Sequence, residues 1–302
     1  MDFDSRPFPH RSLPTCSARS YVRGKAGRLI SVNPTGKNRV ISAGASWAPS
    51  SCEVIVVRNV SSRDLRRLLE PGHLHVGEAL DRLGPNVLTD LAANAHVQAV
   101  AEGEILEAEG TIGQKVGYLL DGALAMVKRL PDGREHTVGL LLPTDLFGRL
   151  TGDAAPHRLV AVAKSRVLFF DREAFDMLLS DHPDLERLFL VSVLDELDAA
   201  RDWILMLSGT RVIERVATFL AMLARRQDAY GSAEASPPIQ VRLPVSRKHA
   251  ANVLSVRPES LSRALHALSD LGVIRIMDPA TFEIPDLDAL LAASSEDPVR
   301  GD

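Results

Sequence analysis

The sequence is poor in cysteine. Among its 302 residues only Cys16 and Cys52 occur, both within the first sixty positions. Two cysteines provide neither a disulfide framework nor the paired spacing of a structural zinc site. We therefore expect a chain that folds without disulfides and without a metal, in a reducing compartment.

Long apolar runs are missing as well. The longest, "FLVSVL" (189–194) and "VGLLLP" (138–143), are far shorter than the roughly 18 to 20 residues that a membrane-spanning helix needs. With 45% hydrophobic and 25% charged residues, the composition is typical of a soluble globular protein, and the length allows two domains. We expect a cytoplasmic protein with no membrane partner.

Motifs of the common enzyme classes are also lacking. No HExxH, GxSxG or phosphate-binding loop occurs, and no pair of acids has the setting of a catalytic dyad. Asp195, Glu196 and Asp198 are most simply the solvated face of a helix. We expect no enzymatic activity and no catalytic residue.

Charge is unevenly distributed along the chain. The formal net charge is -4, but residues 211–263 hold nine Lys or Arg against four acids, and the residues after Arg263 hold two against eight. A local excess of basic residues favours a surface that binds phosphates. The alternative is ordinary solvated charge.

Residues 1–60 are rich in Arg, Ser, Pro and Gly, poor in acids, and show no sustained period of 2 or 3.6. We expect a disordered extension there, or a mis-assigned start codon ahead of the true protein. An Arg-rich and Ser-rich, acid-poor segment is also typical of an organelle transit peptide.

Residues 61–182 have the pattern of a β domain. After an expected helix around Glu78 to Leu91, short β-like runs alternate with turn residues. Asp121-Gly122 and Pro131-Asp132-Gly133 are hairpin-type turns, because glycine tolerates positive φ and proline fixes φ ahead of it. This spacing predicts an antiparallel jelly roll.

A long helix is expected over residues 183–208, closed by Gly209. Its apolar residues recur at three, four or seven positions, which fits a helix that pairs with a copy of itself. The alternative is a helix that packs on its own domain. A second helix is expected over 210–227, followed by a polar loop over 228–240. We assign the dimer contacts to Leu190, Leu194, Leu197, Arg201 and Ile204.

Residues 209–302 have the signals of a winged helix-turn-helix, so that the chain as a whole is α+β. Ser246 is a suitable N-cap for a short helix over 247–254, and Pro258 suits the first position of a second helix that Gly272 ends. "VIRIM", a turn at Asp278-Pro279 and "TFEI" predict a hairpin, the wing.

The second helix has two distinct faces. Leu261, Leu265 and Leu268 form a stripe for burial, while Glu259, Ser262, Arg263 and His266 share another face. Arg can bond guanine in a fork and Glu can accept from cytosine, so this face suits a half-site with G·C pairs. The alternative is a helical hairpin that packs on protein and has solvated charges. We assign DNA contacts to Ser246, Arg247, Lys248, Arg257, Glu259, Ser260, Ser262, Arg263 and His266.

"PESLSRALHALSDLGVI" resembles the recognition helix of the CRP/FNR transcription regulators, in which Glu-x-x-Ser-Arg is characteristic. "DELDAARDWILMLSGTRVIERVATFLAMLARR" is similar to the dimerisation helix and following helix of the FNR branch, and "DGREHTVGLLLPTDLFGR" to its sensor domain. The resemblance covers about residues 78–292. Pro258-Glu259 is most similar to the Dnr/Nnr regulators of denitrification. Arg257 departs from the Ser or Thr that relatives often have, which puts helix capping and the outer base preference in doubt.

This resemblance implies a cyclic-nucleotide-binding-like jelly roll as sensor domain. It further implies a homodimer that binds double-stranded DNA at a two-fold symmetric site, with Glu259, Ser262 and Arg263 reading a TTGA-like half-site. RNA polymerase is the implied protein partner. The implied function is sequence-specific regulation of transcription in anaerobic, nitrogen-oxide or related energy metabolism.

Three kinds of signal are known in that family. Cyclic-nucleotide sensors carry Gly-Glu-Leu and Arg-Ser or Arg-Thr in the phosphate cassette, where this chain has Gly148-Arg149-Leu150 and Arg158-Leu159. Loss of the carboxylate removes a buried hydrogen bond of about 1.5 to 3 kcal/mol, so we expect no cyclic AMP. An iron–sulfur cluster needs four thiolates, and two cysteines exclude it for a single chain.

Three alternatives remain. The chain is a haem-dependent nitric oxide sensor, a FixK-like regulator that needs no ligand, or a module that acts through protein partners alone. Five histidines are candidate haem ligands, although none stands out from the sequence, and Cys16 and Cys52 are taken as incidental. These histidines are His73, His75, His96, His136 and His157.

Overall fold

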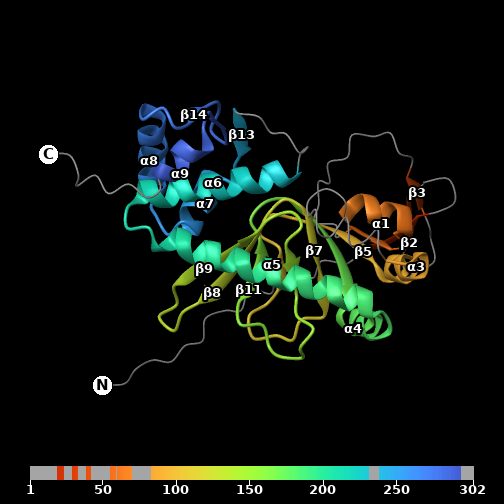
Figure 1. The fold of residues 1–302 in the computed structure, drawn as a ribbon. Helices are drawn as coiled ribbons and strands as arrows, with labels where there is room; N and C mark the ends of the chain where they lie inside the picture. The colour runs from red at the N-terminus through yellow and green to blue at the C-terminus, as the bar shows by residue number, and fades with distance from the viewer. Residues whose placement is uncertain are drawn as a thin grey trace, which may run out of the picture.

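The computed structural model describes most of the chain from residue 83 onward and selected segments before it (Figure 1). The described ranges are 19–23, 29–32, 39–41, 55–58, 60–69, 83–230 and 238–293.

The N-terminal domain consists of two sheets that enclose a common core, the jelly roll that we expected. The smaller sheet has the order β6 (Ile105–Glu107), β11 (Arg158–Ala161), β8 (Leu124–Arg129), β9 (Glu135–Leu141). The larger begins with β10 (Leu146–Phe147), β7 (Lys115–Asp121), β12 (Ser165–Asp171) and β5 (His96–Val100). Both sheets contribute buried residues to the core between them, among them Leu119, Leu124, Leu141, Phe147, Leu159 and Phe169.

Two expected turns connect strands as the sequence indicated. Gly122 joins β7 to β8 with φ +93, and Gly133 joins β8 to β9 with φ +84. At Gly122 a Cβ atom would also lie 2.4 Å from the Lys164 carbonyl oxygen. Only glycine combines this dihedral angle with this close approach.

Within residues 1–60, where we expected a disordered extension, the structure describes four strands. The larger sheet continues beyond β5 through β4 (Ile55–Arg58), β1 (Arg19–Arg23), β2 (Leu29–Val32) and β3 (Arg39–Ile41). These segments contain Val, Ile and Tyr, which favour strands, and β4 pairs antiparallel with β5. Pairing with a formed sheet stabilises strands too short to stand alone. The boundary expected at residue 61 therefore cuts through this sheet.

Helices flank the sheets and connect the domains. They are α1 (Ser62–Leu69), α3 (Pro85–Asn94), α4 (Arg172–Asp181), α5 (Pro183–Ser208) and α6 (Val212–Tyr230). The helix α5 has the bounds that we expected. By contrast, α3 starts seven residues after the Glu78 of our prediction, at Pro85, which suits the first helical position; residues 78–82 lie outside the described ranges. The helix α6 runs on through Asp228 to Tyr230, where we expected a loop.

The C-terminal domain packs against α6. It comprises α7 (Arg247–Val253), α8 (Pro258–Asp270), α9 (Leu287–Ala293) and a sheet of order β13 (Ile239–Arg242), β15 (Thr281–Ile284), β14 (Arg275–Ile276). Figure 1 places α8 at the end of the molecule opposite to α1 and α3. No helix in the described ranges is long and apolar enough to cross a membrane.

Candidate nucleic-acid interface

The helix α7 begins as the sequence predicted. Ser246 is its N-cap, and the Ser246 hydroxyl accepts a hydrogen bond from the His249 backbone N–H at 3.3 Å. Beyond the end of α7, Ser255 adopts φ +54, and the N–H groups of Ser255 and Val256 donate to the carbonyls of Asn252 and Ala251. This pairing closes the helix without a glycine. It fixes the turn that leads into α8.

The helix α8 has the two faces that we expected. Leu261, Leu265 and Leu268 are buried, while Glu259, Arg263 and His266 are exposed and Ser262 is half-buried. Gly272 ends the helix with φ +76, and the Val273 N–H donates to the Leu268 carbonyl at 3.2 Å. The leucines therefore hold α8 to the domain while its polar edge points outward. The exposure of this edge does not separate the two interpretations, because a helical hairpin with solvated charges would expose it as well.

The polar edge is held by contacts to the backbone of α8 itself. Arg263 Nε lies 3.4 Å from the Glu259 carbonyl oxygen, and His266 Nδ1 donates to the Ser262 carbonyl at 2.7 Å. Neither bond uses the end of the guanidinium or the Glu259 carboxylate. Both groups keep the donors and acceptors that base edges require.

Arg257 is the N-cap residue of α8, and its side chain makes no capping hydrogen bond. Arg257 therefore does not provide the side-chain cap that a Ser or Thr can provide at this position. The Arg257 side chain is exposed, as is that of Lys248 on α7, whereas Ser260 is half-buried.

The wing lies close to the start of α7. β14 and β15 pair antiparallel as expected, and the Asp278 carboxylate accepts from the N–H groups of Ala280 and Thr281 at 2.7 and 2.8 Å. These bonds hold the pKa of Asp278 below its usual value. Arg247 Nε donates to the Pro279 carbonyl at 2.7 Å. This bond joins α7 to the wing, and the DNA contact that we expected of Arg247 stays a prediction.

A third strand of the wing sheet was missed by our sequence reasoning. We placed residues 228–240 in a loop, yet β13 pairs with β15 from Ile239 to Arg242. The sequence does contain the signal of a strand here, because Ile239, Val241 and Leu243 alternate with polar residues. Arg242, exposed at the end of this strand, adds a basic residue near Asp278 that we did not include.

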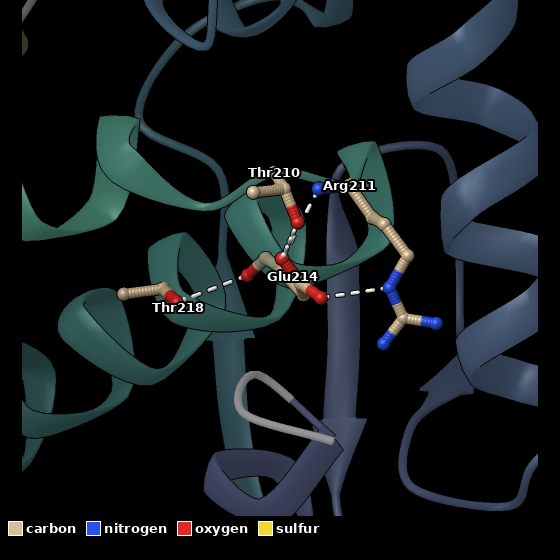
Figure 2. Close-up of polar contacts among 4 residues, drawn as sticks. All are labelled: Thr210, Arg211, Glu214 and Thr218. Carbon is tan, nitrogen blue, oxygen red and sulfur yellow. Dashed lines mark hydrogen bonds and ion pairs between the residues drawn. The ribbon is translucent and has the colours of Figure 1, made fainter. Parts of the chain in front are cut away.

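The start of α6 is fixed by a polar network around Glu214 (Figure 2). The Glu214 carboxylate accepts from the Thr210 hydroxyl at 3.2 Å, the Arg211 N–H at 3.1 Å and Arg211 Nε at 2.7 Å. The bonds from Arg211 lower the pKa of Glu214 to about 2. The next residue, Arg215, donates from Nη1 to the Leu254 carbonyl at 3.1 Å. The first turn of α6 is thereby linked to the end of α7.

An apolar stripe of α5 is exposed to solvent. Ile204 is 69% exposed and Leu194 60%, and Arg201 pairs within its own helix with Asp198 at 2.6 Å. A stripe of this kind is typical of a surface that another chain covers. It comprises Leu190, Val193, Leu194, Leu197, Ile204 and Leu205.

The cassette positions of the sensor domain carry arginines rather than a ribose-binding acid. Gly148 has φ +90, and a Cβ there would lie 2.1 Å from the Lys115 carbonyl oxygen. Arg149 is exposed and acts on Glu107, whose pKa burial raises while Arg149 opposes the rise. Arg158 donates to the Glu135 carboxylate at 3.0 Å. An Arg158 so paired is not a free cation for a phosphate.

Comparisons with known proteins agree with this architecture. Residues 97–182 match the family model described as a cyclic nucleotide-binding domain, and residues 214–293 match the Crp-like helix-turn-helix domain. The solved structure of FixK2 from Bradyrhizobium japonicum superposes with a TM-score of 0.58 at 25% identity, covering 67% of this chain and 98% of that one.

Two curated relatives extend the match. The transcriptional activator protein FnrL of Cereibacter sphaeroides is 32% identical over 60% of this chain and 73% of the relative. The nitrogen fixation regulation protein FixK of Bradyrhizobium diazoefficiens is 30% identical over 61% of this chain and 78% of the relative. Both are named as regulators, in agreement with our expectation that the chain is not an enzyme. With a nucleotide-binding-type domain, an outward-facing recognition helix and these relatives, the chain belongs to the CRP/FNR family of DNA-binding transcription regulators.

Proposed function

We propose that the protein acts as a homodimer that binds a two-fold symmetric, TTGA-like DNA site. The observation that carries the proposal is the outward edge of α8, where the Glu259 and Arg263 side chains leave their base-reading groups open. Arg263 suits the O6 and N7 atoms of guanine, and Glu259 suits the amino group of cytosine. The G·C pair of a TTGA half-site contains both.

The exposed stripe of α5 supports the homodimer. Six large apolar side chains along one helix would remain in water in a single chain. Pairing with the same stripe of a second copy buries them and places two α8 helices in one assembly. A symmetric dimer then requires a symmetric DNA site.

The two curated relatives support the physiological role. One is named a transcriptional activator and the other a nitrogen fixation regulator. We propose a place in the FNR branch and control of anaerobic, nitrogen-oxide or related energy metabolism, exerted through RNA polymerase. The similarity of Pro258-Glu259 to the Dnr/Nnr regulators stays a prediction.

For the signal, we propose that cyclic AMP is not the ligand. The family resemblance puts Arg149 at the position of the ribose-binding glutamate, and Arg158 is paired with Glu135. We favour a FixK-like regulator without a haem. Of the five histidines, His73 and His75 lie outside the described residues. His96, His136 and His157 belong to separate segments of the chain.

Electrophoretic mobility shift with the full chain tests the DNA-binding proposal. A duplex with a TTGA-containing palindrome should bind more tightly than a random duplex, and both should weaken with salt as counterions are released. Arg263→Ala should cost roughly 1 to 3 kcal/mol on the palindrome and relax the preference at one base pair. Arg166→Ala, an exposed arginine of the sensor domain, is the matched control.

Equal binding of parent and Arg263→Ala to both duplexes would contradict the assignment of Arg263. A shift of neither duplex would favour a module that acts through protein partners alone. An absorption spectrum with and without added haem and nitric oxide tests the signal. A Soret band that moves with the gas would overturn the ligand-free proposal.

A further inference from the structure

The exposed stripe of α5 contains a regular seam. The seam residues follow one another at alternating steps of four and three positions, and all of them are exposed. They are Leu190, Leu194, Leu197, Arg201 and Ile204. Alternating steps of this kind are the a and d positions of a coiled coil. In this frame Leu194 and Arg201 take a positions, so that one a position of the seam carries a charge.

Arg201 has a counter-charge at the edge of the seam. Its Nη1 lies 2.6 Å from the Asp198 carboxylate, three residues earlier on the same helix, at a position that flanks the seam. In the single chain the two side chains are 67% and 71% exposed, and an ion pair so exposed adds little to stability. The pair matters more once a second helix covers the seam, because a covered guanidinium needs a compensating carboxylate.

The direction of pairing follows from where the C-terminal domain lies. Figure 1 places α8 toward the carboxyl end of α5. Parallel pairing of two α5 helices therefore puts both α8 helices at the same end of the dimer. Antiparallel pairing would separate them by about the length of α5, which is ~39 Å for its 26 residues.

Arg201 distinguishes the possible pairings further. In a parallel, in-register pair each a residue meets its own counterpart. Arg201 then meets Arg201 of the partner subunit, and the two Asp198 carboxylates balance both guanidiniums within one layer. In an antiparallel pair, or in one shifted by seven residues, Arg201 would instead lie against leucines of the other helix. A charge among apolar side chains is the costlier arrangement.

Resting on the homodimer of the proposed function, we propose that Arg201 and Asp198 form a charged layer that restricts α5 to parallel, in-register pairing with a second copy of this chain. A single polar a position fixes register and partner at a cost in stability. The dimer is therefore weaker than one with a fully apolar seam. A helix with a different residue at this position is a poorer partner than an identical copy.

Exchange between two chains tests which residues face each other. Parent and Arg201→Glu are mixed in equal amounts as full chains without DNA, one of them isotope-labelled, and the dimers are counted by native mass spectrometry. Opposite charges then share a layer only in the mixed dimer, which should rise from about half of all dimers, the random value, to roughly four-fifths. Arg166→Glu, with the same change of charge on the sensor domain, should give the random value.

A double-mutant cycle tests the role of Asp198. By sedimentation velocity at low salt, Asp198→Ala should raise the dimer Kd roughly threefold, and added salt should shrink this rise because it screens the two guanidiniums. Arg201→Leu should lower the Kd at least roughly tenfold. In the Arg201→Leu background, Asp198→Ala should leave the Kd unchanged.

Two results would overturn the charged layer alone, in a parent that does dimerise. One is random exchange between parent and Arg201→Glu, and the other is an equal effect of Asp198→Ala with and without Arg201. A parent that stays monomeric over the whole concentration series would instead refute the homodimer itself, and this inference with it. The two failures are thus distinguishable.

Discussion

At the scale of single residues, two arginines of the helix-turn-helix have different tasks. Arg263 stands on the outward edge of α8, and its Nε lies near a carbonyl of its own helix, whereas Arg247 Nε donates to the Pro279 carbonyl and so ties α7 to the wing. Both are basic residues of one short segment, so composition does not separate them. The two arginines differ instead in their hydrogen-bond partners.

Arg247→Ala should weaken binding to specific and random duplexes alike. The variant lacks the hydrogen bond between α7 and the wing, whereas the base-reading edge of α8 is unchanged. The binding free energy should therefore weaken by about 1 kcal/mol, the net contribution of one hydrogen bond. The preference for the palindrome should persist. Quantitative mobility shift on both duplexes measures this. A selective loss on the palindrome would instead make Arg247 a base-reading residue.

Glu214 predicts an acid dependence of stability. Its folded-state pKa, about 2, lies below the value near 4.3 of an unfolded glutamate. The network with Thr210 and Arg211 therefore stabilises the fold above that unfolded value and loses its effect as pH falls toward 2. Glu214→Gln should lower the free energy of unfolding by about 1 kcal/mol at neutral pH, the size of a helix-capping contact.

Urea unfolding of parent and Glu214→Gln from neutral to acid pH tests this. The difference between the two should shrink as the acid side is approached. A difference that stays constant down to the lowest pH at which both fold would mean that charge plays no part in the cap.

At the scale of elements, α5 serves the fold and the assembly with opposite faces. Leu185, Leu188 and Met206 are buried within the chain, whereas Leu194 and Ile204 are exposed. The sequence predicted the bounds of α5 and its apolar seam from periodicity alone. It left open whether the seam packs on its own domain, and the exposure of this stripe settles that point for the single chain.

Leu194→Ala should weaken self-association. A symmetric interface loses two leucines, each worth about 1.5 kcal/mol or more, which corresponds to roughly a hundredfold rise in the dimer Kd. Sedimentation velocity over a concentration series measures it. Glu186→Ala, an exposed residue of the same helix outside the stripe, is the control, and unchanged association of Leu194→Ala would place the interface elsewhere.

At the scale of the whole molecule, the two domains share one core. Ala125 and Leu140 of the sensor sheet belong to the same cluster as Phe219 of α6 and Leu254 of the helix-turn-helix. The pair between Asp145 and Arg226 spans the same junction. Because Asp145 is only 7% exposed, removal of Arg226 alone would leave a buried charge unpaired, a costly change.

Glu196 makes this junction sensitive to pH. Its folded-state pKa is raised to about 7, so the folded chain holds a proton that the unfolded chain releases. For this group, stability is greatest below about pH 4 and falls as pH rises toward 7. Glu196→Gln is neutral at every pH, so its stability should not show this decrease. The variant should therefore become more stable than the parent at alkaline pH.

Unfolding midpoints in urea across that range, at fixed ionic strength, test the prediction, with Glu186→Gln as the control on the same helix. Parallel curves for parent and Glu196→Gln would contradict it. The effect should become smaller in a variant that lacks Asp145, because burial is the main cause of the raised pKa of Glu196 and the Asp145 carboxylate adds to it.

The sequence by itself determined the local elements and the faces of the C-terminal helices. Ser246, Pro258 and the leucines of α8 act over one or two turns, so capping and periodicity reveal them. The jelly-roll turns at Gly122 and Gly133 were equally readable. The short strands β1 to β4 and β13 could not be predicted from the sequence, because they depend on pairing with strands distant in the chain.

Only the tertiary structure decided which side chains form hydrogen bonds with distant parts of the chain. Arg247 and Arg158 are alike basic in sequence, yet their partners, Pro279 and Glu135, lie 32 and 23 residues away. A cavity beside Trp203 likewise combines β9, α5 and α6. Hydrogen bonds and packing at such separations follow from how the domains meet, and no local pattern encodes that.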